Sequence, residues 1–240
     1  MNIGVIGIGG QGETLARRLA SLGHEVSISN SRGPESMVAV ATEIGARPVS
    51  VVDAVRTSEF VIVSIPTKAV PDLPQELFLN VPDSLIVVDT CNYHPSLRDG
   101  SIEAIDSGML ESEWVAQRLG RPVVKAFNNI FAPSLLEKGT PTGTVGRIAL
   151  SVAGDQATAK GAVLHLIDDL GFDPIDAGGL SESWRQQTGT PAYCRDLDAS
   201  ALRRALAEAE YGQIGHYRAR EEARIRETTA AEKSQRSTSS

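Results

Sequence analysis

The strongest constraint on this chain is a glycine-rich turn, GIGGQG at residues 7–12, which directly follows a short apolar run. An apolar run of this length predicts a buried strand of a parallel sheet. After the turn, leucines recur at helical spacing up to Gly23, and residues 24–29 predict a second strand. A strand–turn–helix–strand unit of this kind predicts an α/β fold with parallel strands.

Each glycine of the turn has its own physical use. Gly7 permits the tight turn, Gly9 lets the backbone approach a pyrophosphate, and Gly12 lets the helix pack close to the strand. Phosphates are then expected on the unpaired N–H groups at the helix N-terminus. Because the motif lies between a predicted strand and a predicted helix, it favours a dinucleotide site built from residues 7–12, including Gly10 and Gln11, over a purely structural turn.

The end of the second predicted strand indicates which nucleotide binds. NAD-binding domains usually place a carboxylate there, where it accepts hydrogen bonds from the ribose 2′-hydroxyl. This chain has Asn30, Ser31 and Arg32 instead. The guanidinium of Arg32 suits phosphate oxygens, and Ser31 and Asn30 add short donors, so the sequence favours NADP(H). The alternative is a polar turn with a solvated arginine.

The rest of the chain alternates apolar strands with helical or loop segments, as βαβ units do. Residues 49–54 are expected to mix a short third strand with a short helix, and residues 146–154 to continue the sheet. The other predicted strands are 59–66, 84–90, 121–127 and 172–176, and the other predicted helices are 34–45, 156–170 and 180–187. The pattern predicts a Rossmann-like, doubly wound, mostly parallel sheet.

Composition changes near Arg195, beyond which the chain is rich in Ala, Arg and Glu. Residues 198–229 carry a patchy apolar stripe, which predicts a long, largely solvated helix that is broken at Gly212 or Gly215. We therefore expect an NADP-binding domain at residues 1–195, an appended C-terminal helical extension at 196–233 and a disordered tail at 234–240.

Charge and composition exclude several classes of protein. The net charge of −7 argues against a general nucleic-acid binder, which would present a basic surface. No stretch approaches the roughly 20 apolar residues that span a bilayer, and the N-terminal strand predicts no cleavable leader. Two cysteines, Cys91 and Cys194, form neither a disulfide framework nor a metal cluster. We expect a cytoplasmic protein without bound metal, membrane or nucleic acid.

Polar residues directly follow several predicted strands. In an open parallel sheet, ligands bind beyond the carboxyl ends of the strands. Residues 30–32, 64–67, 90–94, 128–129 and 176–179 are therefore expected to join the glycine turn in one site, shared by a cofactor and a second ligand, with Ser64 among the cofactor contacts.

The site offers only weak candidates for catalysis, namely Asn92, His94 and Asn128. His94 follows a strand end and is placed to donate a proton to a substrate oxygen, although a surface-loop histidine is the commoner case. Asn128 either hydrogen-bonds a ligand or ties down a loop. Aromatic residues that could stack on a ring are few, and the candidates are Tyr93, Phe127, Phe131 and Trp184.

Five segments resemble the coenzyme F420-dependent NADP oxidoreductase family: GIGGQG at 7–12, NSRGPES at 30–36, SIP at 64–66, DTCN at 89–92 and KAFN at 125–128. The same fold forms the cytosolic reductase domain of the STEAP metalloreductases. The resemblance covers about residues 1–190, so the C-terminal helix and tail fall outside it.

This resemblance implies hydride transfer between NADP(H) and the deazaflavin F420, or a flavin as in the STEAP relatives. It also implies that Ser31 and Arg32 hold the 2′-phosphate, that Ile65 and Pro66 lie along the cofactor, and that Asn92 lies near its nicotinamide end. Hydride transfer between two rings depends on stacking and alignment more than on an acid or base.

Three functions remain open at this point. The first is an NADPH:deazaflavin or flavin oxidoreductase, and the second is an NADPH-dependent reductase of a small carbonyl or imine with His94 as the proton donor. The third is a non-enzymatic NADP(H) sensor that reports occupancy through its C-terminal helix. The partner in the first two is a small-molecule acceptor, and we also expect a homodimer with that helix as an arm.

Overall fold

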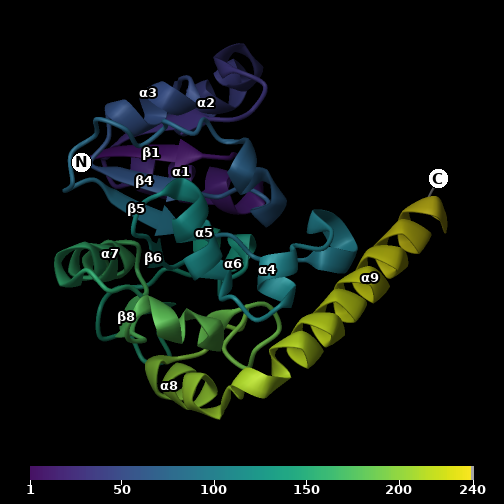
Figure 1. The fold of residues 1–240 in the computed structure, drawn as a ribbon. Coiled ribbons are helices and arrows are strands. Elements are labelled where there is room, and N and C mark those ends of the chain that lie inside the picture. Colours follow the sequence, from purple (N-terminus) through teal and green to yellow (C-terminus); the bar gives the residue numbers. More distant parts are fainter. Residues whose placement is uncertain (239–240) are drawn as a thin grey trace.

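Six parallel strands form the central sheet of the computed structural model, in the order β3-β2-β1-β4-β5-β6 (Figure 1). The structure describes the backbone of residues 1–238 and the side chains of residues 1–231. From β1 the chain first adds β2 and β3 on one side of the sheet and then crosses over to add β4, β5 and β6 on the other side, as in a doubly wound sheet. The strands are β1 Asn2–Ile6, β2 Glu25–Ser29, β3 Arg47–Pro48, β4 Phe60–Val63, β5 Ile86–Asp89 and β6 Val124–Lys125.

Helices cover both faces of this sheet, because the strands carry apolar side chains on each of their two faces. Phe60 and Ile62 of β4 enter one core, whereas Val61 and Val63 enter the other. The first core packs against α1 Gly10–Ser21, α2 Val38–Ile44, α6 Ala132–Glu137 and α7 Ala157–Asp169, and the second against α3 Val51–Arg56, α4 Glu103–Asp106 and α5 Glu111–Leu119. The predicted Rossmann-like α/β fold is confirmed.

Short 3₁₀ and π turns replace full helices at several connections. The 3₁₀ segments are Pro34–Met37, Thr67–Asp72, Leu180–Gln186 and Tyr211–Gln213, and a π turn spans Pro95–Asp99. The stretch at 49–54, expected to mix a short strand with a short helix, holds the start of helix α3, whereas the two-residue strand β3 lies just before it.

The strand predicted at 146–154 does not join the parallel ladder of the central sheet. Its core, β7 Ala149–Val152, pairs in parallel with β8 Asp173–Asp176 in a separate two-stranded sheet. One antiparallel bridge, between Lys125 and Ala153, joins the two sheets. The reason is that β6 is only two residues long and the backbone turns at Phe127, which has a positive φ of 60°, so the edge offers no further parallel partner.

The C-terminal segment forms two helices, as the predicted break implies. Helix α8 runs from Ala199 to Glu208, and α9, Ile214–Thr238, extends away from the body of the molecule (Figure 1). The break spans 209–213 and includes Gly212, one of the two predicted positions. Helix α9 is less solvated than predicted, because Arg218 and Glu222 are buried.

The helical backbone of α9 continues to Thr238, whereas the sequence predicts a disordered tail from residue 234. Residues 239 and 240 of that predicted tail lie outside the described residues. Within the described part of the chain, no helix is both long enough and apolar enough to cross a membrane.

A buried ion pair holds the last two strands of the sheet together. Lys125 of β6 donates from Nζ to Oδ2 of Asp89 at 3.1 Å and to the carbonyl oxygen of Cys91 at 2.5 Å, and both charged side chains are fully buried. Asp89 also accepts hydrogen bonds from the Ser112 hydroxyl and the Cys91 N–H. The strand ends that carry the site are thus fixed by a network with satisfied partners.

This network predicts a large cost for removing one charge. Lys125→Met leaves the Asp89 carboxylate buried without its partner, so the free energy of unfolding should fall by about 3–5 kcal/mol. The double variant Lys125→Met, Asp89→Asn should recover part of that loss. Urea unfolding measures both, with Lys138→Ala, from an exposed pair with Asp196, as a control that should cost less than about 1 kcal/mol. Equal losses for the two lysine variants would contradict this account.

Candidate functional site

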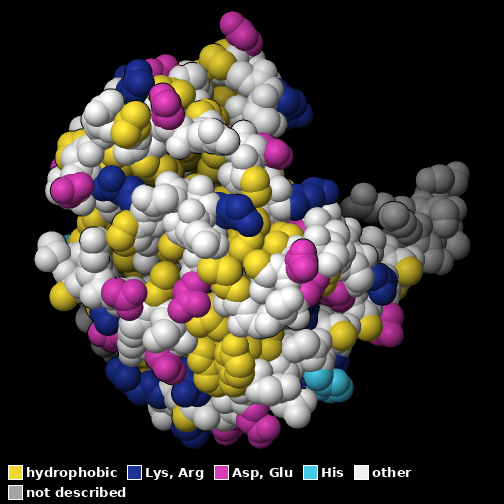
Figure 2. Space-filling model, viewed as in Figure 1, with side chains coloured by type: hydrophobic (Ala, Val, Ile, Leu, Met, Phe, Trp, Pro, Cys, Tyr) yellow, Lys and Arg dark blue, Asp and Glu magenta, His cyan; other side chains and the backbone are white. Residues whose placement is uncertain are grey.

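A cavity of about 730 Å³ opens at the carboxyl ends of β1, β2, β4, β5 and β6. Figure 2 shows the surface hollowed on the side toward which the arrow of β1 points in Figure 1. Most of the predicted site residues line this cavity: Gly7, Gly9, Gly10, Gln11, Asn30, Ser31, Ser64, Ile65, Pro66, Asn92, His94 and Asn128. Gly12, Arg32 and residues 176–179 lie outside its lining, and the prediction for 176–179 was wrong because this segment follows β8 of the separate two-stranded sheet.

The glycine turn has the packing that its sequence predicts. Gly7 has a φ of +96°, and a side chain on Gly12 would place its Cβ 1.9 Å from the carbonyl oxygen of Gly7. Helix α1 can therefore approach β1 only because residue 12 has no side chain. In contrast, a Cβ on Gly9 or Gly10 would meet nothing within 4 Å. The open space lies beside these two residues, where a phosphate group would need it.

The N-terminus of α1 presents donors to this space. Gly9 is the N-cap residue and has no side chain to cap the helix, so the first N–H groups have no intrahelical partner. The side-chain amide of Gln11 donates from Nε2 to the carbonyl oxygen of Phe127 at 2.8 Å. This bond ties the glycine turn to the end of β6. The arrangement is an anion site of the kind that binds pyrophosphate.

The turn after β2 leaves Ser31 and Arg32 exposed. Asn30 is committed to the turn itself, because its Oδ1 accepts from the Arg32 N–H at 2.8 Å and its Nδ2 donates to the Ser36 hydroxyl at 3.0 Å. Among the described residues, the Arg32 guanidinium has no hydrogen-bond or ion-pair partner. Arg32 and Ser31 are therefore free to contact a phosphate at this end of the cavity.

Asn92 and Asn128 hold the other end of the cavity together. The Asn128 amide donates from Nδ2 to the Asn92 Oδ1 at 3.2 Å and to the Gln186 carbonyl at 2.6 Å, and its Oδ1 accepts from the Gln186 side chain at 3.0 Å. Asn92 donates from Nδ2 to the Asn128 carbonyl at 3.3 Å. Because every polar atom of the Asn128 side chain has a protein partner, this residue fits the loop-tying alternative.

His94 lies in the wall of the cavity, so it is more enclosed than a surface-loop histidine. Its backbone N–H donates to Oδ2 of Asp99 at 2.8 Å, while its Nδ1 is buried and has no hydrogen-bond partner among the described residues. Burial and the nearby positive charge of Arg98 lower the pKa of the imidazole below its usual value. His94 is therefore neutral at pH 7 and has a free ring nitrogen.

Sequence reasoning missed one wall of the cavity, which comes from Tyr193 and Cys194. These residues lie far along the chain from the parallel strands, and no motif marks them. Cys194 has a positive φ of 46°, an uncommon conformation for a residue with a side chain. Burial raises the pKa of its thiol to about 12, so it is not a nucleophile at neutral pH.

Two of the four aromatic candidates for stacking, Phe127 and Phe131, line the cavity, and Tyr93 and Trp184 do not. Tyr93 is fully buried behind the wall, where its hydroxyl donates to Asp106 at 3.0 Å. Phe131 is 44% exposed, so its ring faces are accessible to a ligand. Stacking in this cavity therefore depends on Phe131 more than on the buried rings of Phe127 and Tyr193.

This geometry defines the class of the protein: a dinucleotide-binding domain of the Rossmann type. Residues 2–93 match the family described as NADP oxidoreductase, coenzyme F420-dependent. The structure is similar to that of SMa0349, a hypothetical protein from Sinorhizobium meliloti, with a TM-score of 0.69 and 32% identity, covering 82% of this chain and 95% of that one. The chain belongs to the coenzyme F420-dependent NADP oxidoreductase family, a family of NADP-dependent oxidoreductases.

Two further proteins are similar to the chain or to part of it. A candidate F420-dependent NADP reductase from Arthrobacter sp. FB24 is 26% identical, with a TM-score of 0.62 over 76% of this chain and 87% of that one. The Escherichia coli protein YjhV is 45% identical over 73 residues, which are 30% of this chain and 53% of that protein. The chain therefore spans about half the length of this curated relative.

The open space beside Gly9 predicts a separation of folding from binding. In Gly9→Val the new Cβ meets no protein atom within 4 Å, and the backbone angles of residue 9 suit valine, so the unfolding free energy should stay within about 0.5 kcal/mol of the parent. The valine would occupy the space for the pyrophosphate, so nucleotide binding should be lost. Thermal unfolding with and without NADP⁺ measures both effects. A Gly9→Val protein that NADP⁺ still stabilises would contradict this placement.

The lowered pKa of His94 predicts an acid-sensitive stability. The unfolded chain binds a proton at this histidine near its ordinary pKa of about 6.5, whereas the folded chain binds it only at lower pH. Stability is therefore fully present above about pH 6.5 and falls as the pH drops toward the folded value. Urea unfolding between pH 5 and 8 should show a smaller decrease in His94→Asn than in the parent. The remaining slope comes partly from His24, whose pKa is also lowered by burial. Identical slopes would show that His94 is not shielded from water.

Proposed function

We propose that the protein transfers a hydride between NADPH and a ring acceptor, either the deazaflavin F420 or a flavin. The observation that carries the proposal is that the glycine turn and Ser31 line one cavity, with the exposed Arg32 directly after Ser31 in the chain. No carboxylate follows β2 to repel a 2′-phosphate, and the free Arg32 guanidinium offers it a charged partner. The family match supports the same nucleotide.

The residues of the cavity fit the parts of this nucleotide in order. Gly9, Gly10 and the N–H groups of α1 would hold the pyrophosphate, and Ser31 and Arg32 the 2′-phosphate. Ser64, Ile65 and Pro66 would lie along the cofactor, and Asn92 would face its nicotinamide end. NADPH itself supplies the hydride when bound. The role of the protein is then to orient two rings and keep water from between them.

The space for the acceptor is the part of the cavity walled by Phe131, Tyr193 and Cys194. This wall adjoins the Asn92 end, where the nicotinamide is proposed to lie, because the Cys194 thiol and the Asn92 amide both donate to the Asn128 carbonyl oxygen. No group of three or more His, Cys, Asp or Glu that could hold a metal occurs among the described residues. An apolar and aromatic wall suits a planar ring better than a small polar substrate.

A second candidate function is the reduction of a small carbonyl or imine. It is favoured by the buried, unpartnered Nδ1 of His94 in the cavity wall. In this case the imidazolium form of His94 would hydrogen-bond the substrate heteroatom and pass it a proton, and the neutral imidazole would then take up a proton from solvent. Turnover would then depend on the ionisation of His94, whereas transfer between two rings would not.

The experiment that tests the function is a titration with NADPH and NADH, followed by oxidation of bound NADPH with F420, FMN or FAD. We expect NADPH preference and rapid turnover with one ring acceptor. Tight NADPH binding without ring turnover would favour carbonyl or imine substrates, or a non-enzymatic sensor if no acceptor works. Failure of both nucleotides to bind would overturn the proposal.

A substitution tests the nucleotide assignment. Arg32→Ala should weaken NADPH by roughly 1–3 kcal/mol because it removes a charge-assisted contact, while NADH binding should change little. Arg56→Ala, at the exposed end of α3, is a matched control that should leave both affinities unchanged. Equal losses for NADPH and NADH in Arg32→Ala would refute the 2′-phosphate contact.

The proposal extends to the organisation of the chain. We propose residues 1–195 as the nucleotide-binding domain and residues 196–233 as an extension whose helix α9 is an arm in a homodimer. The projection of α9 from the body supports an arm (Figure 1). The two free cysteines, Cys91 and Cys194, suit a reducing cytoplasm. Sedimentation equilibrium would test the dimer.

A further inference from the structure

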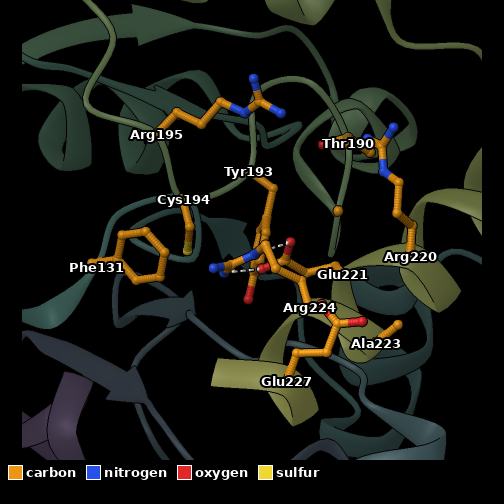
Figure 3. A pocket seen from close by; sticks show the side chains of 11 residues that line it. Phe131, Thr190, Tyr193, Cys194, Arg195, Arg220, Glu221, Ala223, Arg224 and Glu227 are labelled. Atoms are coloured by element: carbon orange, nitrogen blue, oxygen red, sulfur yellow. Dashed lines mark hydrogen bonds and ion pairs between the residues drawn. The ribbon is translucent and has the colours of Figure 1, made fainter. Parts of the chain in front are cut away.

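A second cavity, of about 550 Å³, lies between α9 and the loop at residues 189–195 (Figure 3). It is lined from one side by the loop and from the other by α9, with Phe131 at its edge. Nothing in the nucleotide site as proposed above uses this space. Its charged lining comprises Arg195, Arg220, Glu221, Arg224 and Glu227.

The second cavity adjoins the nucleotide cavity. Phe131, Tyr193 and Cys194 line both of them, so a molecule that occupies the acceptor space beside these residues can extend from one cavity into the other. Figure 3 shows Tyr193 and Cys194 pointing toward α9 from the loop. The positive φ of Cys194 places a strained residue in the wall between the cavities, a position where strain is often functional.

The charges in the second cavity favour an anion. Arg224 is already neutralised, because it forms two hydrogen bonds with Glu221, at 2.9 Å from Nε and 2.6 Å from Nη2. Arg195 and Arg220 have no hydrogen-bond or ion-pair partner among the side chains that the structure describes. In Figure 3 their guanidinium groups lie on one side of the view and Glu227 on the opposite side. Two unpaired, exposed arginines among the lining residues are thus available to a ligand.

The wall made by α9 is fixed in place. Arg218 donates to Oε1 of Glu111 at 2.9 Å, and Glu222 accepts from the Ser96 N–H at 3.1 Å. On the opposite side, a Cβ on Gly189 would lie 2.1 Å from the Tyr217 carbonyl oxygen, so the loop approaches the helix as closely as a glycine allows. The arginines therefore project from a supported surface, although α9 continues into solvent beyond it.

We propose that this second cavity binds the anionic group, phosphate or carboxylate, carried on the side chain of the ring acceptor. Arg195 and Arg220 are the charged partners of that group, and Phe131 and Tyr193 flank the passage to it. The inference rests on the proposed function, because it assumes that a ring acceptor occupies the nucleotide cavity. To the proposed function it adds the basis of acceptor specificity. Helix α9 selects acceptors with an anionic tail, and this helix lies outside the segments that resemble the family.

The test compares FMN with riboflavin, which carry the same ring and differ by one phosphate. Flavin fluorescence quenching gives the dissociation constants for the full-length protein loaded with NADP⁺, and NADPH oxidation gives the KM values. We expect FMN to bind about five- to tenfold more tightly than riboflavin. In Arg195→Ala, Arg220→Ala that advantage should vanish while riboflavin binding stays unchanged. The control Arg203→Ala, Arg204→Ala removes two exposed arginines of α8 and should keep the advantage.

Each outcome bears on one of the two proposals. Equal affinity for FMN and riboflavin in the parent, or an FMN advantage that survives in Arg195→Ala, Arg220→Ala, would overturn the anion site. The same holds if the control loses the advantage equally, because net charge alone would then explain it. Binding of FMN that depends on these arginines, without any oxidation of NADPH, would support the anion site while refuting the proposed hydride transfer.

Discussion

The close approach of α1 to the end of β1 is the contact on which the nucleotide site depends. A side chain on Gly12 would collide with the Gly7 carbonyl. A Cβ on Gly7 would lie 2.3 Å from the carbonyl oxygen of Ser64, the residue directly after β4. Because both positions are glycine, the helix N-terminus, β1 and β4 meet in one place. The unpaired N–H groups of α1 then face the cavity, and the turn after β2 faces it from the adjoining strand.

The opposite end of the cavity depends on contacts between distant parts of the chain. The Lys125–Asp89 pair fixes the ends of β5 and β6. Asn128 joins these strand ends to the 3₁₀ segment Leu180–Gln186 by hydrogen bonds with Gln186. Beyond them, α9 braces the loop that carries His94 through Glu222 and Ser96. The parallel sheet thus supplies the nucleotide half of the site, and the C-terminal elements supply the half that faces the acceptor.

This division explains how much could be predicted from the sequence. The glycine turn, the polar turn at Asn30 and the strands other than β3 follow from local patterns, and each of these strands lies within its predicted range or overlaps it. The wall formed by Tyr193 and Cys194 follows from tertiary packing, which no local motif reports. The prediction that residues 146–154 continue the sheet was wrong, because apolar periodicity identifies a strand but not its partner. Likewise, the buried Arg218 and Glu222 looked solvated, since charged residues are buried only when tertiary partners such as Glu111 reach them.

The most direct test of the central claim is a crystal structure of the protein grown with NADP⁺. The account predicts the pyrophosphate on the N–H groups of Gly10 and Gln11, and the 2′-phosphate within hydrogen-bond distance of Ser31 and the Arg32 guanidinium. It also predicts the nicotinamide beside Asn92, with open space between its ring and Phe131. A nucleotide bound elsewhere, or one whose 2′-phosphate points away from Arg32 into solvent, would contradict the account.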